Sequence, residues 1–238
     1  MRLDKFLCKM NLGTRSRTKA FIRQGLVKVN GFLIKSPDFQ VDEEKDQVTF
    51  QGEILRYQKF HYFMLNKPAG TVSATADRNE RTVLELLGQD LSKGLFPVGR
   101  LDKDTEGLLL ITDDGDLAHH LLSPKRHVGK TYLVTAEHPL TLSDIAALEE
   151  GVDIGEKKPT LPASVQRLSE KELLLTIHEG KFHQVKRMLQ AVGNQVIALK
   201  RVGFGPLKLD EGLKSGEYRK LSEQEVSALY ESGKKNAS

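Results

Sequence analysis

The chain has 238 residues, enough for two domains, and its 39% hydrophobic and 29% charged residues are typical of a folded globular protein rather than a disordered or membrane-embedded one. No apolar run approaches the ~18 residues of a transmembrane helix, and the N-terminal segment contains an acid and no apolar signal-peptide core. A single cysteine, Cys8, rules out an internal disulfide, so we expect a cytoplasmic protein.

Charge is distributed unevenly along the chain. The first 35 residues carry nine Lys or Arg and one acid, a net charge of +8, so the remaining residues sum to −4 against a whole-chain charge of +4. A basic module at one end is the electrostatic footprint of a nucleic-acid-binding protein. The alternative is a solvated charged face with no partner.

Residues 1–58 have the pattern of two short helices followed by a small sheet. Apolar residues recur with helical period in "MRLDKFLCKM". A second helix begins at Thr14 or Ser16 and ends at Gly25, and the Asn-Gly pair at 30–31 predicts the turn of a hairpin. A unit of this length is large enough to fold as a small domain.

Residues 59–232 mix strands and helices without a regular strand–helix–strand repeat. The apolar run at 107–112 and the β-branched, aromatic stretch at 130–141 predict strands, and 182–193 predicts an amphipathic helix. This pattern favours an α+β domain built on a large mixed, mostly antiparallel sheet flanked by helices. Residues 233–238 are expected to form a disordered tail.

A dense group of acids follows in "VGRLDKDTEGLLLITDDGD". Asp102, Asp104, Glu106 and Asp113 match positions 1, 3, 5 and 12 of a calcium loop, but Asp replaces the usual Glu at position 12 and the segment upstream has no helical period. The histidines form no zinc motif, and the chain has no phosphate-binding glycine loop. We expect no metal site, with the calcium loop as the rival interpretation.

The same acids allow a second interpretation, in which Asp102 does chemistry. In an extended segment Arg100 and Asp102 share a face, and a nearby cation favours the ionised form of a carboxylate. An oriented carboxylate can act as a nucleophile or stabilise a sugar cation. A purely structural Asp–Arg pair is the alternative.

The first unit carries one of two family resemblances. "RLDKFL" and "SRTKAFIRQGLVKVNG" resemble the S4 RNA-binding domain in element order, spacing and charge. Basic residues of such a domain contact RNA phosphates, and these contacts supply affinity and salt dependence rather than sequence specificity. The residues that the resemblance implies on the RNA-facing surface are Arg2, Lys5, Arg15, Arg17 and Arg23.

The rest of the chain resembles the pseudouridine synthases of the RsuA branch, which modify ribosomal RNA. The segments that carry this resemblance are "YFMLNKPAG", "GRLDKDTEGLLLITDDG", "SPKRHVGKTYLV", "IHEGKFHQVKRMLQAVG" and "LKRVGFGPLKL", and with the S4 unit they cover about residues 1–230. The resemblance implies isomerisation of uridine to pseudouridine, which adds and removes no electrons and so needs no cofactor. The target base must be flipped out of its stack into a pocket.

The resemblance also implies roles for single residues. Asp102 matches the catalytic aspartate, and Tyr132 matches the tyrosine that stacks on the target base and can remove the C5 proton. Lys186 matches the basic residue that pairs with the aspartate; Arg187 is the weaker candidate, since adjacent helical residues face apart. The residues implied to contact RNA around this site are Lys67, in a motif that supports the site, Arg100, which matches the arginine that fills the gap left by the flipped base, Lys130 and Arg187.

Other polar residues of these motifs are interpreted as structural. We expect Asp104 and Thr105 to shape the loop after Asp102, Asp116 to cap the next helix, and His183 to be a hydrogen-bonded edge histidine.

Two segments resemble one group of enzymes within this branch more closely than another, and this difference concerns the substrate. "LTIHEGKFHQVKRM" and "LVTAEHPL" are closer to the small-subunit enzymes than to their large-subunit relatives. We therefore expect a monomeric enzyme that acts on 16S ribosomal RNA or on a small-subunit assembly intermediate. The alternatives are a 23S-specific synthase and an S4-led RNA-binding assembly factor without catalysis.

Overall fold

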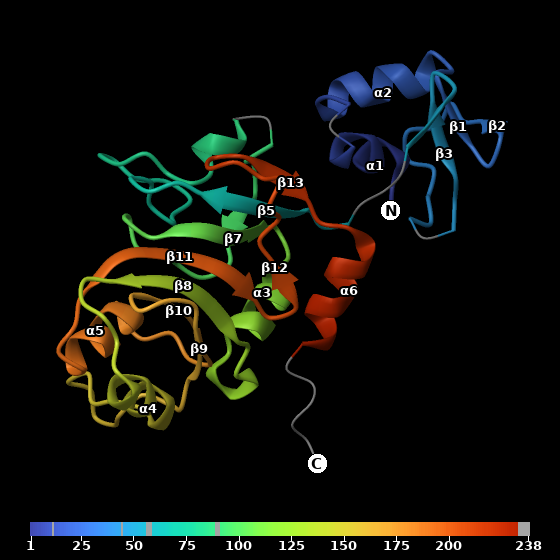
Figure 1. Ribbon diagram of the computed structural model, residues 1–238. Coiled ribbons are helices and arrows are strands. Elements are labelled where there is room, and N and C mark those ends of the chain that lie inside the picture. Colours follow the sequence, from blue (N-terminus) through green and yellow to red (C-terminus); the bar gives the residue numbers. More distant parts are fainter. Residues whose placement is uncertain (11, 44, 56–58, 89–90, 233–238) are drawn as a thin grey trace. The chain divides into compact units, whose positions relative to one another are not determined.

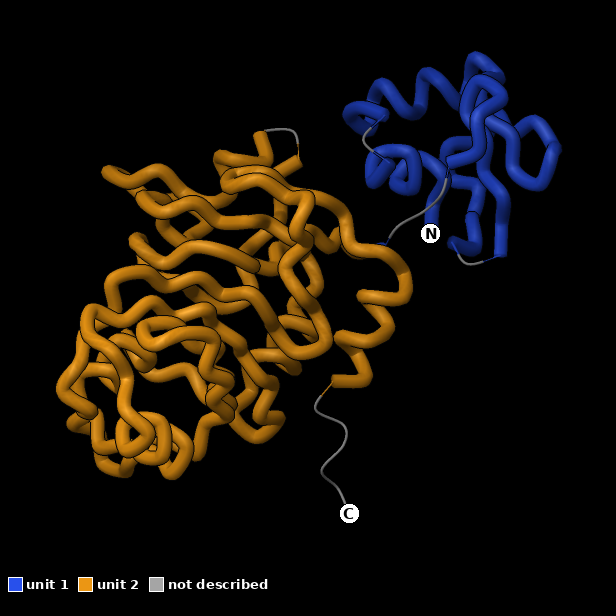
Figure 2. The backbone as a smooth tube through the Cα atoms, viewed as in Figure 1, with its two compact units in different colours: residues 1–59 blue, residues 60–238 orange. Residues whose placement is uncertain are grey.

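The computed structural model describes residues 1–10, 12–43, 45–55, 59–88 and 91–232 (Figure 1). The chain divides into two units, Met1–Lys59 and Phe60–Ser238, and each is described by itself (Figure 2). The expected disordered tail at 233–238 lies outside the described residues. Within those residues, no helix has the length and apolar character needed to cross a membrane.

The smaller unit is two helices packed on a four-stranded antiparallel sheet of order β2-β1-β3-β4. Thr14 caps the second helix by accepting a hydrogen bond from the backbone N–H of Arg17. Asn30 and Gly31 both have positive φ, as the predicted hairpin turn requires. The elements are α1 (Leu3–Lys9), α2 (Arg15–Arg23), β1 (Val27–Val29), β2 (Phe32–Leu33), β3 (Val48–Phe50) and β4 (Glu53–Leu55).

The larger unit contains a nine-stranded sheet, with the central order β13-β5-β7-β11-β8-β10-β9. Strands β7 and β11 pair in parallel and the other pairs are antiparallel, which confirms the mixed, mostly antiparallel sheet. The strands are β5 (Tyr62–Lys67), β6 (Phe96–Pro97), β7 (Glu106–Thr112), β8 (Lys130–Ala136), β9 (Ser164–Arg167), β10 (Glu172–Ile177), β11 (Val196–Phe204), β12 (Leu207–Lys208) and β13 (Tyr218–Lys220).

Helices cover both faces of this sheet. Because successive side chains of a strand point to opposite faces, Leu109 and Ile111 of β7 join one core cluster while Leu108 and Leu110 join the other. The first cluster takes residues from α4 and α5, and the second from α3 and α6. The helices are α3 (Gly115–Leu122), α4 (Leu142–Glu150), α5 (Gln184–Ala191) and α6 (Glu223–Glu231), with short 3₁₀ helices at Glu85–Leu87 and Pro124–Arg126.

The parallel pair β7–β11 depends on one glycine. Gly107 has φ of +100°, and a Cβ built on it would lie 2.2 Å from the carbonyl oxygen of Arg201. A side chain at 107 would therefore push the two strands apart. The close approach puts the start of β7, directly after the acidic loop, beside the middle of β11.

Two local predictions need correction. Asp114, not Asp116, caps α3, because the helix begins at Gly115 and the residue before it accepts the N–H of Leu117. The helix predicted from residue 182 begins at Gln184 instead, since His183 adopts a left-handed backbone conformation with φ of +47°. Phe182 and His183 consequently lie in the turn before α5.

Candidate active site

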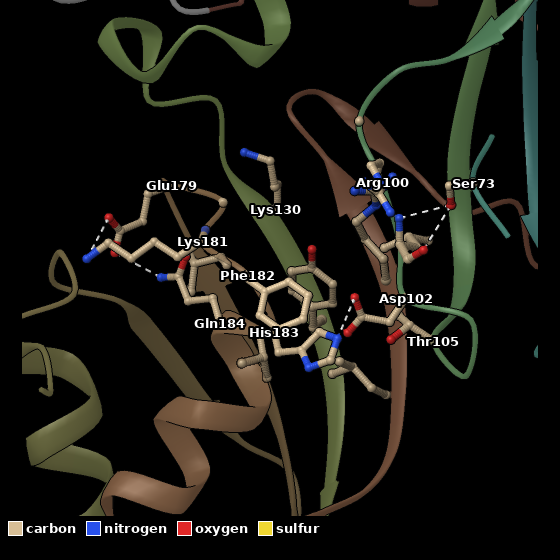
Figure 3. Close-up of a pocket in the computed structure, with 18 of the residues that line it drawn as sticks. Ser73, Arg100, Asp102, Thr105, Lys130, Glu179, Lys181, Phe182, His183 and Gln184 are labelled. Carbon is tan, nitrogen blue, oxygen red and sulfur yellow. Dashed lines mark hydrogen bonds and ion pairs between the residues drawn. The ribbon is translucent and has the colours of Figure 1, made fainter. Parts of the chain in front are cut away.

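A pocket lined by both charged and apolar side chains lies beside β8 and β11 of the larger unit (Figure 3). One wall is the loop between β6 and β7, and the other is the segment that leads from β10 into α5. The residues expected from the sequence that line it are Arg100, Asp102, Lys130, Tyr132 and Lys186.

Asp102 lies between the side chains of Lys186 and His183. Its Oδ2 is 3.4 Å from Nζ of Lys186, and its Oδ1 is 3.6 Å from Nε2 of His183. The carboxylate is 30% exposed, so it is open to a ligand in the pocket. Among the described residues, Asp102 forms ion pairs with these two and not with Arg100, which is exposed and lines the same pocket.

Lys186 is shared between two acids. Its Nζ donates to both carboxylate oxygens of Asp104, at 2.6 and 2.8 Å. Burial lowers the pKa of Lys186, but its hydrogen bond to Asp104 and the charges of Asp102 and Asp104 outweigh burial and raise the pKa overall. The hydrogen bond from Lys186 in turn lowers the pKa of Asp104. Lys186 thus contacts two carboxylates, of which Asp102 lines the pocket and Asp104 does not.

Lys67 anchors the loop that carries Asp102. Lys67 is fully buried and donates hydrogen bonds to the backbone carbonyls of Pro68, Lys103 and Thr105, at 3.1, 3.3 and 2.8 Å. Burial lowers the pKa of Lys67 to about 8 against the opposing charges of nearby acids. Lys67 does not line the pocket, so its position fits support of the site and not contact with RNA.

Ser73 anchors the same loop through the backbone of Leu101. Its hydroxyl accepts the N–H of Leu101 at 3.0 Å and donates to the carbonyl of Leu101 at 2.9 Å (Figure 3). The backbone N–H of Thr105 closes a turn onto the carbonyl of Asp102 at 3.1 Å. These bonds orient Asp102 before any ligand binds.

Arg187 points away from the acids that Lys186 binds. Its guanidinium pairs with Glu156 at 2.9 Å and donates to the backbone carbonyls of Phe182 and Ile154. The residue is absent from the pocket lining. This placement follows from the helix geometry that made it the weaker candidate.

A buried cation lies next to Tyr132. Tyr132 is 8% exposed and pairs across the sheet with Arg201, which is 2% exposed and also lines the pocket. The Nε of Arg201 donates to the carbonyl of Leu108 at 2.7 Å, and its Nη2 has no hydrogen-bond partner among the described residues. Burial lowers the pKa of Arg201, and its interactions with Tyr132 oppose this shift.

Lys130 adds to the positive charge on this side of the pocket. Burial and the nearby charge of Arg201 lower the pKa of Lys130 to about 8. The hydroxyl of Thr105 is a second buried polar group that lacks a partner among the described residues. The buried, partly unsatisfied donors suit a polar ligand that carries oxygen acceptors.

The sequence interpretation missed three residues of this site. His183 is a neighbour of Asp102 rather than an edge histidine, and Asp104 binds Lys186 rather than only shaping a turn. Arg201 stands in an apolar strand segment, where two adjacent basic residues, "KR", were the available signal.

The rival calcium loop does not form. Seven of its twelve positions, Glu106–Thr112, belong to β7, whose side chains alternate between the two core clusters. A calcium loop needs its ligands at positions 1, 3, 5, 7, 9 and 12 gathered around one point.

In the smaller unit, the basic residues expected to meet RNA are exposed. Arg2 is held by a two-pronged hydrogen bond to Asp4, at 3.1 and 3.0 Å, and the Arg17 guanidinium lies 5.5 Å from the ring centroid of Phe21. The exposed residues of this set are Arg2, Lys5, Arg15, Arg17 and Arg23.

The chain is similar to known proteins over nearly its whole length. Residues 61–191 match the RNA pseudouridylate synthase family, and residues 1–48 match the S4 domain. The chain is 46% identical over 236 residues to the uncharacterized RNA pseudouridine synthase YtzG of Bacillus subtilis, covering 97% of this chain and 99% of that one. It is 45% identical to ribosomal small subunit pseudouridine synthase A of Haemophilus influenzae, covering 96% and 99%. A crystal structure of a pseudouridylate synthase superimposes with a TM-score of 0.70 at 44% identity, covering 96% and 99%.

Proposed function

Since the chain belongs to the RNA pseudouridine synthases that carry an N-terminal S4 domain, we propose that it isomerises a uridine of small-subunit (16S) ribosomal RNA, with Asp102 as the catalytic aspartate. The observation that carries the proposal is the oriented carboxylate of Asp102 in an open pocket, between Lys186 and His183. Relatives that match over nearly their whole length are named ribosomal small subunit pseudouridine synthase A, which supports the 16S substrate.

The reaction rearranges bonds within one nucleotide. The N1–C1′ bond breaks, the uracil turns, and C5 bonds to C1′; C5 then loses its proton while N1 gains one from solvent. Asp102 contacts the sugar or the base during this exchange, and the ammonium of Lys186, 3.4 Å away, orients the aspartate. The substrate and product have the same composition, so the reaction consumes no oxidant, reductant or group donor.

Tyr132 receives the flipped base in this proposal. An aromatic face is a suitable surface for an unstacked base, and Tyr132 lies in the pocket with little exposed surface of its own. Its hydroxyl can take the C5 proton. Exposed Arg100 at the same pocket suits the gap that the flipped base leaves in the RNA.

The S4 unit supplies affinity in this proposal. We take residues 1–58 as the RNA-binding domain, residues 59–232 as the catalytic domain, and the enzyme as a cytoplasmic monomer. Deleting residues 1–58 should weaken RNA binding and leave the hydrogen-exchange protection of β5, β7 and β11 intact. An unfolded remainder would contradict two independent domains.

Tritium release tests the proposed activity. RNA labelled at C5 of uridine loses tritium to water when pseudouridine forms. We expect release of one equivalent from a 16S transcript or a small-subunit assembly intermediate, none from 23S, and none with Asp102→Asn. Asp116→Asn is the matched control, because Asp116 is exposed and outside the pocket.

The other outcomes separate the alternatives. Release from 23S alone would move the enzyme to the large subunit. Tight 16S binding without release from any RNA would favour the non-catalytic assembly factor.

A further inference from the structure

Phe182 is an aromatic side chain that the proposed reaction does not use. It lines the same pocket as Asp102, yet it is 74% exposed (Figure 3). Because this exposed ring belongs to the pocket that contains Asp102, its face is accessible to a ligand that enters the pocket. The position lies in the turn before α5, which corrects the helix start expected from the sequence.

The ring is held in a defined orientation. Its centroid lies 3.8 Å from that of the His183 imidazole, with an interplanar angle of 19°, so the two rings stack. Arg187 donates to the carbonyl of Phe182 at 3.1 Å, and the N–H of Lys181 donates to the side chain of Gln184 at 2.9 Å. A pre-ordered ring loses little conformational entropy when a ligand stacks on it.

The backbone at His183 also indicates a positioned pair. His183 has φ of +47°, a left-handed conformation that is uncommon for residues with a side chain. This conformation turns the imidazole so that its ring contacts Phe182 while its Nε2 lies 3.6 Å from Asp102. The aromatic pair therefore adjoins the catalytic carboxylate.

The chemistry around the pair favours a nucleotide. A flat apolar surface beside cations matches the two parts of an unpaired nucleotide, because the base stacks and the phosphate meets the charges. Arg100, Lys130 and Lys186 supply positive charge in the same pocket. An apolar peptide side chain would offer these cations no acceptor, whereas a phosphate would.

We propose that the Phe182–His183 pair is a stacking platform for an unpaired RNA base adjacent to the target uridine. The target base itself goes to Tyr132 inside the pocket, so the exposed ring at the rim receives a neighbour. The inference rests on the proposed function, because it assumes that the uridine at Asp102 belongs to an RNA strand.

A fluorescent variant tests stacking directly. The chain contains no tryptophan, so Phe182→Trp in the full-length protein introduces a single indole at the platform. We expect its fluorescence to be quenched when an RNA stem–loop with the modified uridine is added. An abasic nucleotide on the stacked side of the uridine should remove the quenching, and one on the other side should not.

Kinetics of Phe182→Ala test the contribution to binding. Loss of one stacked base should raise KM for the same RNA about 5- to 100-fold and lower kcat much less. Phe182→Trp should keep KM near the wild-type value. Leu142→Ala is the matched control, because Leu142 is 77% exposed and outside the pocket, and it should change neither constant.

A cycle that combines Phe182→Ala with the abasic RNA identifies the contact. If Phe182 stacks on that base, the abasic site weakens binding to the wild type and has no further effect on Phe182→Ala. Unchanged fluorescence at saturating RNA, or additive losses in the cycle, would overturn the platform. A fall in kcat with KM unchanged would also overturn it, since the ring would then act on His183 and Asp102.

Failure of the platform differs from failure of the proposed function. Tritium release with no fluorescence change leaves the synthase intact and removes the platform. No tritium release from any RNA by the wild type removes the proposed function, and a fluorescence change on binding would still report stacking.

Discussion

Lys67→Met is expected to destabilise the larger unit by about 2–6 kcal/mol at pH 7. The wild-type ammonium donates to three backbone carbonyls, and each bond to a charged donor contributes about 1.5–3 kcal/mol. Burial opposes this gain: lowering the pKa from 10.5 to about 8 corresponds to about 3 kcal/mol. Methionine fills similar space but leaves the three carbonyls without their donor.

The pH dependence of this difference is the sharper test. In the folded chain Lys67 loses its proton near pH 8, while in the unfolded chain it keeps it until about pH 10.4. Between these values the unfolded state binds more protons, so the wild type gains stability as pH rises and Lys67→Met does not. The stability difference between them should grow by about 1 kcal/mol from pH 8 to pH 9.

The free energy of unfolding of wild type and Lys67→Met can be compared by urea unfolding. Hydrogen exchange of peptides from β5 and β7 reports the unfolding of the larger unit, to which Lys67 belongs. Lys171→Met is the control, because Lys171 is exposed and donates to one surface carbonyl, of Glu137. A Lys67→Met protein as stable as the wild type, or a difference that shrinks above pH 8, would refute the assignment of Lys67 as a buried support of the loop.

Three further predictions concern stability and RNA affinity. Asp114→Ala should destabilise the protein by about 2–4 kcal/mol in urea unfolding, because buried Asp114 accepts from the hydroxyls of Tyr62 and Tyr230 and from the N–H of Leu117; a loss below 1 kcal/mol would contradict this. The hydrogen bond from Arg219 lowers the pKa of Glu225 to about 2, so its contribution is complete above pH 4.5 and is lost as pH falls toward 2. With a discount for partial exposure, the stability difference between wild type and Glu225→Gln should fall by about 1–2 kcal/mol from pH 6 to pH 2, and a constant difference would refute it. Arg15→Ala with Arg17→Ala should reduce the slope of log affinity against log salt by about 1.5, whereas Lys171→Ala should not; an unchanged slope would remove these arginines from the RNA surface.

The sequence predicted the sheet because its strongest strand is buried on both faces. The continuous apolar run at 107–112 becomes β7, whose alternate residues enter the two cores. An uninterrupted run of strand length is what such a position requires. The start of α5 could not be predicted in this way, since a left-handed backbone at His183 leaves no trace in apolar periodicity.

Pairing in the site depends on contacts between distant segments. Asp102 and Lys186 are 84 positions apart, and no local sequence pattern predicts that they pair. The family resemblance predicted this pair. Arg201 reaches the pocket through the register of β11 with β8 and through the close approach at Gly107. Asp104 was interpreted as a loop residue because its partner lies on α5, which the loop sequence does not reveal.

The central claim is that Asp102 catalyses pseudouridine formation at one position of small-subunit ribosomal RNA. Ribosomal RNA from cells that lack this gene, complemented with wild type or with Asp102→Asn, tests it when pseudouridine is mapped by carbodiimide labelling and primer extension. We predict one small-subunit stop that is lost with the gene and returns only with the wild type. An unchanged set of stops in both subunits, or a stop that returns with Asp102→Asn, would contradict the claim.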